Sequence, residues 1–281
     1  MQAVRRRAVL VAPGSDERKA RKALASAADE VVLDLEDAVT PANKVTARKA
    51  AGALVAEFGP TRPVSVRVNG FDTEWFPDDV SACKQMGSAL ATVILPKSET
   101  PAQLAEMDRL LNDSPTRLQA LVETPLGVRD IAAICTATSR LDAAIIGYAD
   151  LGASLGRGPQ APGEVWHAIQ DAVLIAARAA GVSVIDGPHL TIADDEQFRR
   201  AKSWVCDLGF DGTWVLHPAQ IESATRIFTP DPAAIDDARH VLAALEAAAQ
   251  HGSGATQWDG RMLDEALAAS ARRVLAKAGM W

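Results

Sequence analysis

The chain alternates short apolar runs with longer segments in which apolar residues recur at helical spacing. Most of the runs are continuous in Val, Ile, Leu and Ala, which is typical of strands buried on both faces. The eight runs are Arg7–Ala12, Glu30–Leu35, Pro63–Val68, Leu90–Leu95, Leu118–Val122, Ala143–Ile146, Val182–Ile185 and Gly212–Leu216. Because parallel strands need helical crossovers between them, the pattern predicts an α/β fold of repeated β-then-α units.

The intervening segments carry helix-start signals. Ser15-Asp16 can cap one helix, and Pro41 and Pro101 lie near the first turns of two others. The helices predicted in this way are Ser15–Ala28, Pro41–Phe58, Pro101–Leu111, Asp194–Leu208 and Ala219–Phe228. Eight β-then-α units over residues 1–230 predict a (β/α)8 TIM barrel as the catalytic domain.

An open, doubly wound sheet is the competing fold, but no GxGxxG follows the first run, so the main support for a dinucleotide-binding sheet is missing. Beyond Pro230 two more helices are predicted, Ala233–Gln250 and Met262–Lys277, joined by the glycine-bearing segment His251–Ala255. Residues 231–281 therefore form a predicted C-terminal helical lid or extension, which either packs on the barrel or reaches a neighbouring subunit.

Composition is that of a globular protein, with 48% hydrophobic and 23% charged residues. The formal net charge of −7 argues against general nucleic-acid binding, which needs a basic face. Cys83, Cys135 and Cys206 form no CxxC pair, which favours a reducing compartment. The apolar run after Arg5–Arg7 stops at Pro13-Gly14, too early for a signal peptide, and no run could span a membrane. A soluble, cytoplasmic protein is expected.

Ionisable residues follow seven of the eight runs directly. They are Asp34, Glu36 and Asp37 after the second, Arg67 with Asn69 in the third, Lys97 after the fourth, Glu123 after the fifth, Asp150 after the sixth, Asp186 after the seventh and His217 after the eighth. Barrel enzymes place their chemistry where the carboxyl ends of the strands meet, so these groups are expected to converge. Converging carboxylates need cations among them, and Arg67, Lys97 or a metal ion would serve.

Glu123 and Asp150 follow adjacent strands, so their carboxylates could share one divalent ion. Two carboxylates, completed by waters and substrate oxygens, are a common way of holding Mg²⁺. The alternative is that each acid pairs with an arginine or caps the following helix. A zinc site is less favoured, because His217 and His189 are the only histidines near strand ends and a catalytic zinc commonly uses three.

Arg67 lies in the apolar strand Val66-Arg67-Val68-Asn69, where it could clamp a substrate carboxylate or stabilise an oxyanion. An internal ion pair with Glu36 or Asp37 is the alternative, and both roles can hold together. Lys97 could form a Schiff base, but the surrounding carboxylates would keep it protonated, which ranks that route below the metal route.

With these residues the sequence resembles the citrate lyase beta-subunit-like proteins of the HpcH/HpaI aldolase and malyl-CoA and citramalyl-CoA lyase family. The resemblance covers nearly the whole chain. It rests on Pro13-Gly14, Asp34–Val39 with Lys44 and Ala47-Arg48, Val66–Asn69, Leu95–Lys97, Val122–Thr124, Gly147–Gly156, Asp186-Gly187, Gly209–Gly212, His217-Pro218 and Asp259–Asp264. The form Thr213–His217 is associated more with acyl-CoA lyases than with citrate lyase subunits.

The resemblance implies Mg²⁺ on Glu123 and Asp150. It implies that Arg67 faces the substrate, with Glu36 and Asp37 as further catalytic residues that support the site.

It also implies that Arg7 and Lys22 lie near the CoA moiety, and Asn69 and Lys97 are further candidates for substrate or CoA binding. The tail would cover a neighbouring subunit's site and deliver Asp264 as an acid or base, which implies a homotrimer or a dimer of trimers.

The expected activity is a Mg²⁺-dependent carbon–carbon lyase. Its substrate would be a 3-hydroxy-acyl-CoA such as malyl-CoA or citramalyl-CoA, cleaved to acetyl-CoA or propionyl-CoA and glyoxylate or pyruvate. Alternatives are a citrate lyase beta subunit acting on a citryl thioester, a malyl-CoA thioesterase, and a non-catalytic barrel that keeps the ligand site.

Overall fold

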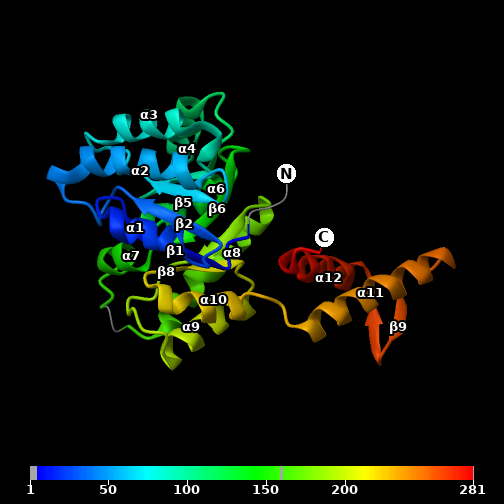
Figure 1. Ribbon diagram of the computed structural model, residues 1–281. Helices are drawn as coiled ribbons and strands as arrows, with labels where there is room; N and C mark the ends of the chain where they lie inside the picture. Colours follow the sequence, from blue (N-terminus) through cyan, green and yellow to red (C-terminus); the bar gives the residue numbers. More distant parts are fainter. Residues whose placement is uncertain (1–4, 159–160, 281) are drawn as a thin grey trace. The chain divides into compact units, whose positions relative to one another are not determined.

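The computed structural model describes residues 5–158 and 161–280, and within them eight parallel strands close into a barrel (Figure 1). The strands are β1 (Ala8–Pro13), β2 (Glu30–Asp34), β3 (Val64–Arg67), β4 (Thr92–Leu95), β5 (Arg117–Val122), β6 (Leu141–Ile146), β7 (Ser183–Asp186) and β8 (Gly212–Val215). Closure occurs because β1 pairs in parallel with both β2 and β8. The predicted (β/α)8 barrel is confirmed, and the open sheet is excluded.

Helices connect successive strands and cover the outside of the barrel. They are α1 (Glu17–Leu24), η1 (Pro41–Asn43), α2 (Lys44–Phe58), α3 (Phe76–Met86), η2 (Gly87–Ala89), α4 (Pro101–Leu111), α5 (Pro125–Arg129), α6 (Ile131–Cys135), α7 (Tyr148–Ser154), η3 (Gly163–Trp166), α8 (His167–Ala179), α9 (Glu196–Leu208), η4 (Pro218–Gln220) and α10 (Ile221–Ile227). Asp16 caps α1 by accepting from the Lys19 N–H, and Pro101 occupies the first turn of α4 behind a Thr100 capping box.

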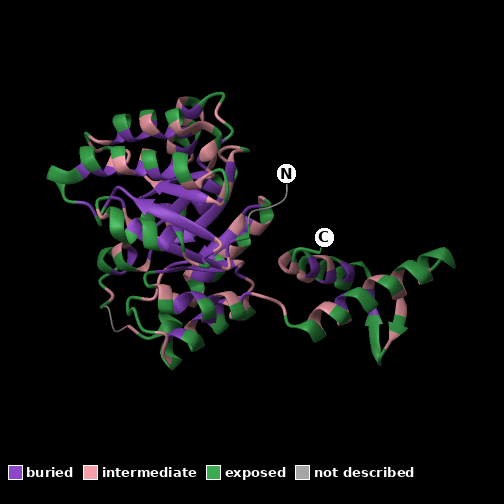
Figure 2. Ribbon diagram, in the orientation of Figure 1, coloured by how far each residue is buried: buried purple, intermediate pink, exposed green. Residues whose placement is uncertain are grey.

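The continuous apolar runs have a direct structural reason. Each strand packs against helices on its outer face and against other strands inside the barrel, so both faces are buried, as Figure 2 shows. The barrel interior is filled by apolar side chains from several strands, namely Val9, Val32, Ile94, Leu121, Ala143, Ile145, Ile185 and Trp214.

A polar layer fills the barrel at the amino-terminal ends of the strands. Glu30 is fully buried and accepts hydrogen bonds from Arg6 Nε (2.6 Å), Ser65 Oγ (2.7 Å) and Gln119 Nε2 (2.7 Å). Arg6 also donates from Nη2 to Asp142 Oδ2 at 2.6 Å. Buried charges are stable only when they are paired and hydrogen-bonded, and these groups satisfy one another. The layer fills the end of the barrel opposite the predicted site.

Replacing Arg6 with Met is expected to lower the free energy of unfolding by about 3–5 kcal/mol, because Glu30 would remain as an unpaired buried carboxylate. For a domain of this size the melting temperature should fall by roughly 6–20 °C. Arg21→Met is the control, because Arg21 pairs with Glu17 and Glu57 on the exposed surface, where ion pairs contribute little, and should leave the melting temperature nearly unchanged. Equal melting temperatures for the two variants would contradict the role of the buried layer.

Residues Arg226–Trp281 form a second compact unit, whereas the barrel unit runs to Thr225. The second unit contains α11 (Pro232–Gln250), β9 (Thr256–Trp258), β10 (Arg261–Leu263) and α12 (Glu265–Ala278). Its core includes Ala238, Val241, Leu263, Ala271 and Leu275.

The predicted linker His251–Ala255 contains no helix or strand, but the predicted start of the last helix at Met262 is wrong, because a β-hairpin follows the linker. Asp259 and Gly260 both have positive φ, 49° and 71°, which is typical of a two-residue hairpin turn, and α12 begins only at Glu265. Asp-Gly between two short apolar segments is a known hairpin signal that could have revealed this element.

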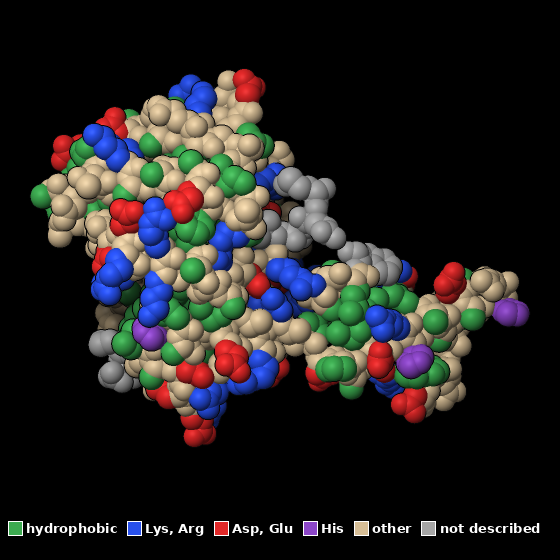
Figure 3. Space-filling view, viewed as in Figure 1, with side chains coloured by type: hydrophobic (Ala, Val, Ile, Leu, Met, Phe, Trp, Pro, Cys, Tyr) green, Lys and Arg blue, Asp and Glu red, His purple; other side chains and the backbone are tan. Residues whose placement is uncertain are grey.

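Two properties of the structure relate to the predictions on membrane spans and on nucleic-acid binding. No helix in the described residues is both long and apolar enough to cross a membrane. On the face shown in Figure 3, Lys and Arg side chains are interspersed with Asp and Glu, in keeping with the net charge of −7.

Candidate functional site

A charged cluster lies at the carboxyl ends of the barrel strands. It comprises Glu36 after β2, Arg67 at the end of β3, Lys97 after β4, Glu123 after β5 and Asp150 in the first turn of α7. Ion pairs and hydrogen bonds connect all five residues. The structure thus joins residues that are up to 114 positions apart in sequence (150 − 36).

Arg67 is anchored mainly by Asp34, a partner that the sequence does not single out. Its Nε and Nη2 donate to the two carboxylate oxygens of Asp34, both at 2.7 Å. The same carboxylate accepts from the N–H groups of Glu36 and Ala38 at 2.9 and 3.0 Å. Although burial opposes ionisation, the Arg67 charge holds the pKa of Asp34 below its ordinary value. Asp34 is therefore the loop anchor among the three acids that follow β2.

The remaining nitrogen of Arg67, Nη1, lies 2.9 Å from Glu36 Oε2 and 3.9 Å from Asp37 Oδ2. The Glu36 contact is ionic without hydrogen-bond geometry, so that oxygen is left without a hydrogen-bond donor. Burial and the Asp37 charge raise the pKa of Glu36, and the nearby Arg67 and Lys97 only partly offset this. Asp37 is largely exposed and lies at the margin of the cluster.

Lys97 contacts three carboxylates. Its N–H donates to Glu123 Oε1 at 2.9 Å, and its ammonium lies 2.5 Å from Glu36 Oε1 and 3.4 Å from Asp150 Oδ2. Although burial lowers it, the pKa of Lys97 is raised overall by its hydrogen bond and charge interactions with Glu36. A protonated amine is a poor nucleophile, which disfavours the Schiff-base route.

Glu123 is the most buried acid of the cluster, with 3% of its surface exposed. Burial and the nearby Glu36 charge raise its pKa to about 8. Gly147 lets the end of β6 approach it closely, because a Cβ there would lie 2.5 Å from both the Cβ and Oε2 of Glu123. The carboxylate therefore has a fixed position and too little compensating positive charge.

This donor set fits a divalent cation of the Mg²⁺ type. Glu123 and Asp150 supply carboxylate oxygens, and a cation would favour the ionised form of Glu123, whose pKa burial and the Glu36 charge raise. Asp150 is open to solvent, with 40% of its side chain exposed. Within residues 5–158 and 161–280, no three His, Cys, Asp or Glu side chains form a metal-holding group. Any cation here would therefore complete its shell with waters or ligand oxygens, as the sequence predicts.

Asn69 is buried beside the cluster. Its side chain donates to Asp79 Oδ2 at 2.6 Å and accepts from Lys44 Nζ at 2.5 Å. Lys44 also donates to the carbonyls of Leu35 and Glu36, both at 2.8 Å. In this arrangement Asn69 fastens the segments after β2 and β3 together.

A second buried network supports the segment that carries Asp150. Tyr148 donates from its hydroxyl to Asp186 Oδ1 at 2.5 Å, and Lys202 Nζ lies 2.5 Å from Asp186 Oδ2. The sequence identifies Asp186 but not Lys202. Lys202 is a lone lysine on the apolar face of α9, and this position in the sequence could have indicated a buried ion pair. This network fixes the first turn of α7.

Three further predicted residues lie away from the cluster. Arg7 pairs with Asp29 at 2.7 Å. It precedes β1 and therefore lies at the amino-terminal ends of the strands, opposite the cluster at their carboxyl ends. Lys22 is exposed in the last turn of α1. Asp264 belongs to the second unit, where it caps α12 by accepting from Ala266 N and Leu267 N at 3.0 and 3.2 Å.

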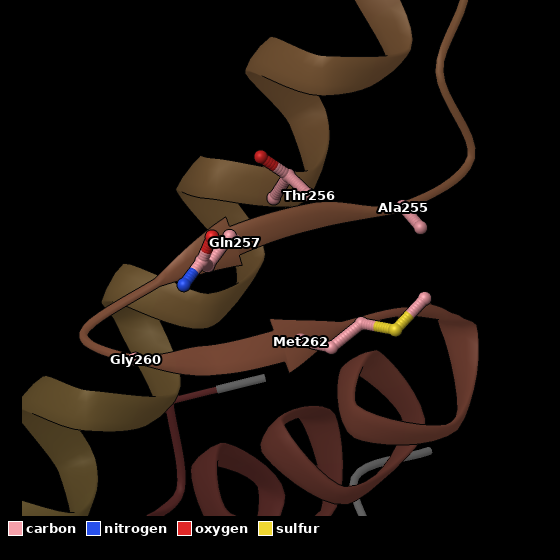
Figure 4. Close-up of a pocket in the computed structure, with 5 residues that line it drawn as sticks. All are labelled: Ala255, Thr256, Gln257, Gly260 and Met262. Carbon is pink, nitrogen blue, oxygen red and sulfur yellow. The ribbon is translucent and has the colours of Figure 1, made fainter.

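A pocket of about 420 Å³ lies on the hairpin of the second unit, as Figure 4 shows. Its lining residues are Ala255, Thr256, Gln257, Gly260 and Met262. Because none of these side chains is ionisable, the charged cluster of the barrel is the stronger candidate for chemistry.

The chain is similar to known proteins over nearly its whole length. The L-malyl-CoA/beta-methylmalyl-CoA lyase of Cereibacter sphaeroides (strain ATCC 17025 / ATH 2.4.3) is 34% identical over 304 residues, covering 98% of this chain and 95% of the relative. The (3S)-malyl-CoA thioesterase of Cereibacter sphaeroides (strain ATCC 17023) is 37% identical over 274 residues, covering 97% and 94%.

Among solved structures, Mycobacterium tuberculosis CitE in complex with magnesium, acetoacetate and coenzyme A has a TM-score of 0.77 and 32% identity, covering 97% of each chain. The family model described as HpcH/HpaI aldolase/citrate lyase matches residues 7–218, which include every residue of the charged cluster. The family resemblance is confirmed: the chain belongs to the HpcH/HpaI aldolase/citrate lyase family.

Proposed function

We propose that this protein is a Mg²⁺-dependent carbon–carbon lyase acting on a 3-hydroxy-acyl-CoA of the malyl-CoA or citramalyl-CoA type. The observation that carries the proposal is the buried, incompletely compensated Glu123 carboxylate in a cluster with Asp150 and Arg67. The similarity to malyl-CoA lyases and to a CitE structure with magnesium and coenzyme A supports it.

In this proposal Glu123 and Asp150 hold the metal. Mg²⁺ when bound supplies Lewis acidity to the oxygens of the 2-oxo-acid half. The hydroxyl proton of the substrate passes to a base, the C–C bond breaks, and its electrons form the enolate of the acyl thioester. Arg67 stabilises that negative charge, because Asp34 already fixes the guanidinium and little reorganisation is needed.

The proposal also assigns supporting roles to other residues at or near the cluster. Glu36 and Asp37 support the position of Arg67, and Lys97 and Asn69 assist substrate binding. Lys22 stays a predicted CoA contact, which the CoA affinity of its Ala variant would test. The predicted CoA contact of Arg7 is not carried further, because Arg7 pairs with Asp29 at the end of the barrel opposite the cluster.

Asp264 of the partner subunit is the candidate acid or base for the proton transfer, which requires a homotrimer or a dimer of trimers. A reducing, cytoplasmic location is also part of the proposal, because Cys83, Cys135 and Cys206 lie far apart in the sequence and form no CxxC pair.

The direct test is a screen of purified protein with malyl-, citramalyl-, citryl- and methylmalyl-CoA, with and without Mg²⁺. Glyoxylate or pyruvate is measured as the hydrazone, and free CoA as the thiol. Release of a 2-oxo acid from malyl- or citramalyl-CoA only with Mg²⁺ supports the lyase. Cleavage of none of the four thioesters would contradict it.

A malyl-CoA thioesterase is the second candidate, favoured by the 37% identical relative. Its mark is free malate and CoA thiol without accumulation of glyoxylate. A citrate lyase beta subunit would act on a carrier-protein thioester, and activity of the isolated chain on free acyl-CoA counts against it.

The shared site predicts complementation between inactive subunits. Glu123→Gln and Asp264→Asn should each be inactive alone, whereas co-expressed mixed oligomers should regain up to about a quarter of wild-type activity, because that share of sites draws both intact residues from different chains. Activity is measured per total subunit after tandem affinity purification. No recovery in verified mixed oligomers would contradict the sharing of sites.

A further inference from the structure

Lys97 has a backbone conformation that is unusual for its residue type. It follows β4 and Pro96 and has a φ of 48°, in the left-handed region that side chains with a Cβ disfavour. In this conformation its N–H meets Glu123 Oε1 while its side chain reaches Glu36. One residue thus links the ends of β2, β4 and β5 at some conformational cost.

The ammonium of Lys97 also occupies a place beside Asp150. The distance from Nζ to Asp150 Oδ2 is 3.4 Å, and the side chain of Lys97 is 43% exposed. In the described part of the chain, no other Lys or Arg forms a salt bridge with Asp150. A fixed positive charge therefore stands at the acids that we assign to the metal.

We propose that Lys97 is an internal counter-ion that competes with the divalent cation for Asp150 and thereby weakens metal binding to the substrate-free protein. Two cations cannot both approach Asp150 closely without strong repulsion, so the ammonium must leave this carboxylate when the metal binds. In the metal-free protein the same ammonium compensates Glu36 and Asp150. This inference rests on the proposed metal ligands Glu123 and Asp150.

The test is calorimetric titration of Mg²⁺ into metal-free protein without substrate. Lys97→Met should bind Mg²⁺ at least about tenfold more tightly than wild type, a difference of about 1.4 kcal/mol. Lys97→Arg keeps the positive charge and should stay within about threefold of wild type on the same argument. Lys84→Met is the matched control. Lys84 is an exposed lysine of α3, and its replacement should leave the Mg²⁺ affinity unchanged.

Thermal melts give a second readout that does not depend on turnover. Lys97→Met should melt at a lower temperature than wild type in EDTA and should gain more from saturating Mg²⁺, because tighter binding stabilises the folded state further. Lys97→Gln, which keeps a polar side chain, replaces the Met variant in both measurements if that variant does not fold.

The outcomes separate this inference from the proposed function. If wild type binds Mg²⁺, Glu123→Gln does not, and the neutral Lys97 variant binds no tighter than wild type, the counter-ion proposal is overturned and the metal assignment stands. If neither wild type nor the neutral variant binds Mg²⁺, both fail. If the neutral Lys97 variant binds Mg²⁺ more tightly than wild type and Lys97→Arg does not, the proposal is supported, whatever the activity of the variants.

Discussion

Replacing Glu123 with Gln is expected to abolish Mg²⁺-dependent turnover, lowering kcat/KM by about 10³-fold or more, because a neutral amide removes an anionic oxygen ligand from the metal. The fold should survive, since glutamine has nearly the same shape and can still accept the Lys97 N–H. Circular dichroism and the coupled lyase assay check both parts. Glu106→Gln is the control and should retain full activity, because Glu106 is a half-buried glutamate on α4 that pairs with Arg109 outside the cluster.

The same substitution should change the pH dependence of stability. Because burial and the Glu36 charge raise the pKa of Glu123 from 4.5 to about 8, the folded state holds its proton where the unfolded state has lost it. The stability linked to this proton is fully present below pH 4.5 and is lost as pH rises through about 8. In EDTA, wild type should therefore lose more stability than Glu123→Gln between pH 6 and pH 9. Parallel curves for the two proteins would contradict the raised pKa.

Replacing Arg67 with Met is expected to damage both stability and activity. Without the guanidinium the buried Asp34 loses its charged partner and the buried Glu36 keeps only Lys97, at a cost of about 3–5 kcal/mol. Loss of the positive charge that faces the developing enolate should lower kcat by about 10²–10³-fold in the fraction that folds. Urea unfolding and single-turnover cleavage measure the two effects separately.

Two variants separate charge from geometry at this position. Arg67→Lys keeps the charge but cannot form both parallel bonds to Asp34, so most of the catalytic loss should remain. Arg178→Met breaks a half-buried pair with Asp211 elsewhere in the barrel and should lower stability without lowering kcat. An Arg67→Met protein with wild-type kcat would remove Arg67 from the proposed mechanism.

Local sequence patterns predict the strands and crossover helices, and the count of eight β-then-α units predicts their closure into a barrel. Continuous apolar runs such as Leu118–Val122 can be satisfied only by strands covered on both faces, and helical spacing between the runs supplies the crossovers. The order of the strands then follows from the chain, and polar residues after the runs must meet at one end. For that reason Glu36, Arg67, Lys97 and Glu123 could be assigned to one cluster before any coordinates were considered.

Partner choice within the cluster depends on tertiary structure. Asp34, Glu36 and Asp37 are chemically equivalent in a sequence, and only the register of β2 beside β3, which places Asp34 opposite Arg67, selects Asp34 as the anchor. The contacts of Lys97 with Glu36 and Asp150 likewise depend on its own left-handed backbone. The position of Glu123 depends on the close approach of Gly147. Residue spacing determines which end of a strand a side chain occupies, but packing between distant segments determines which charge it meets.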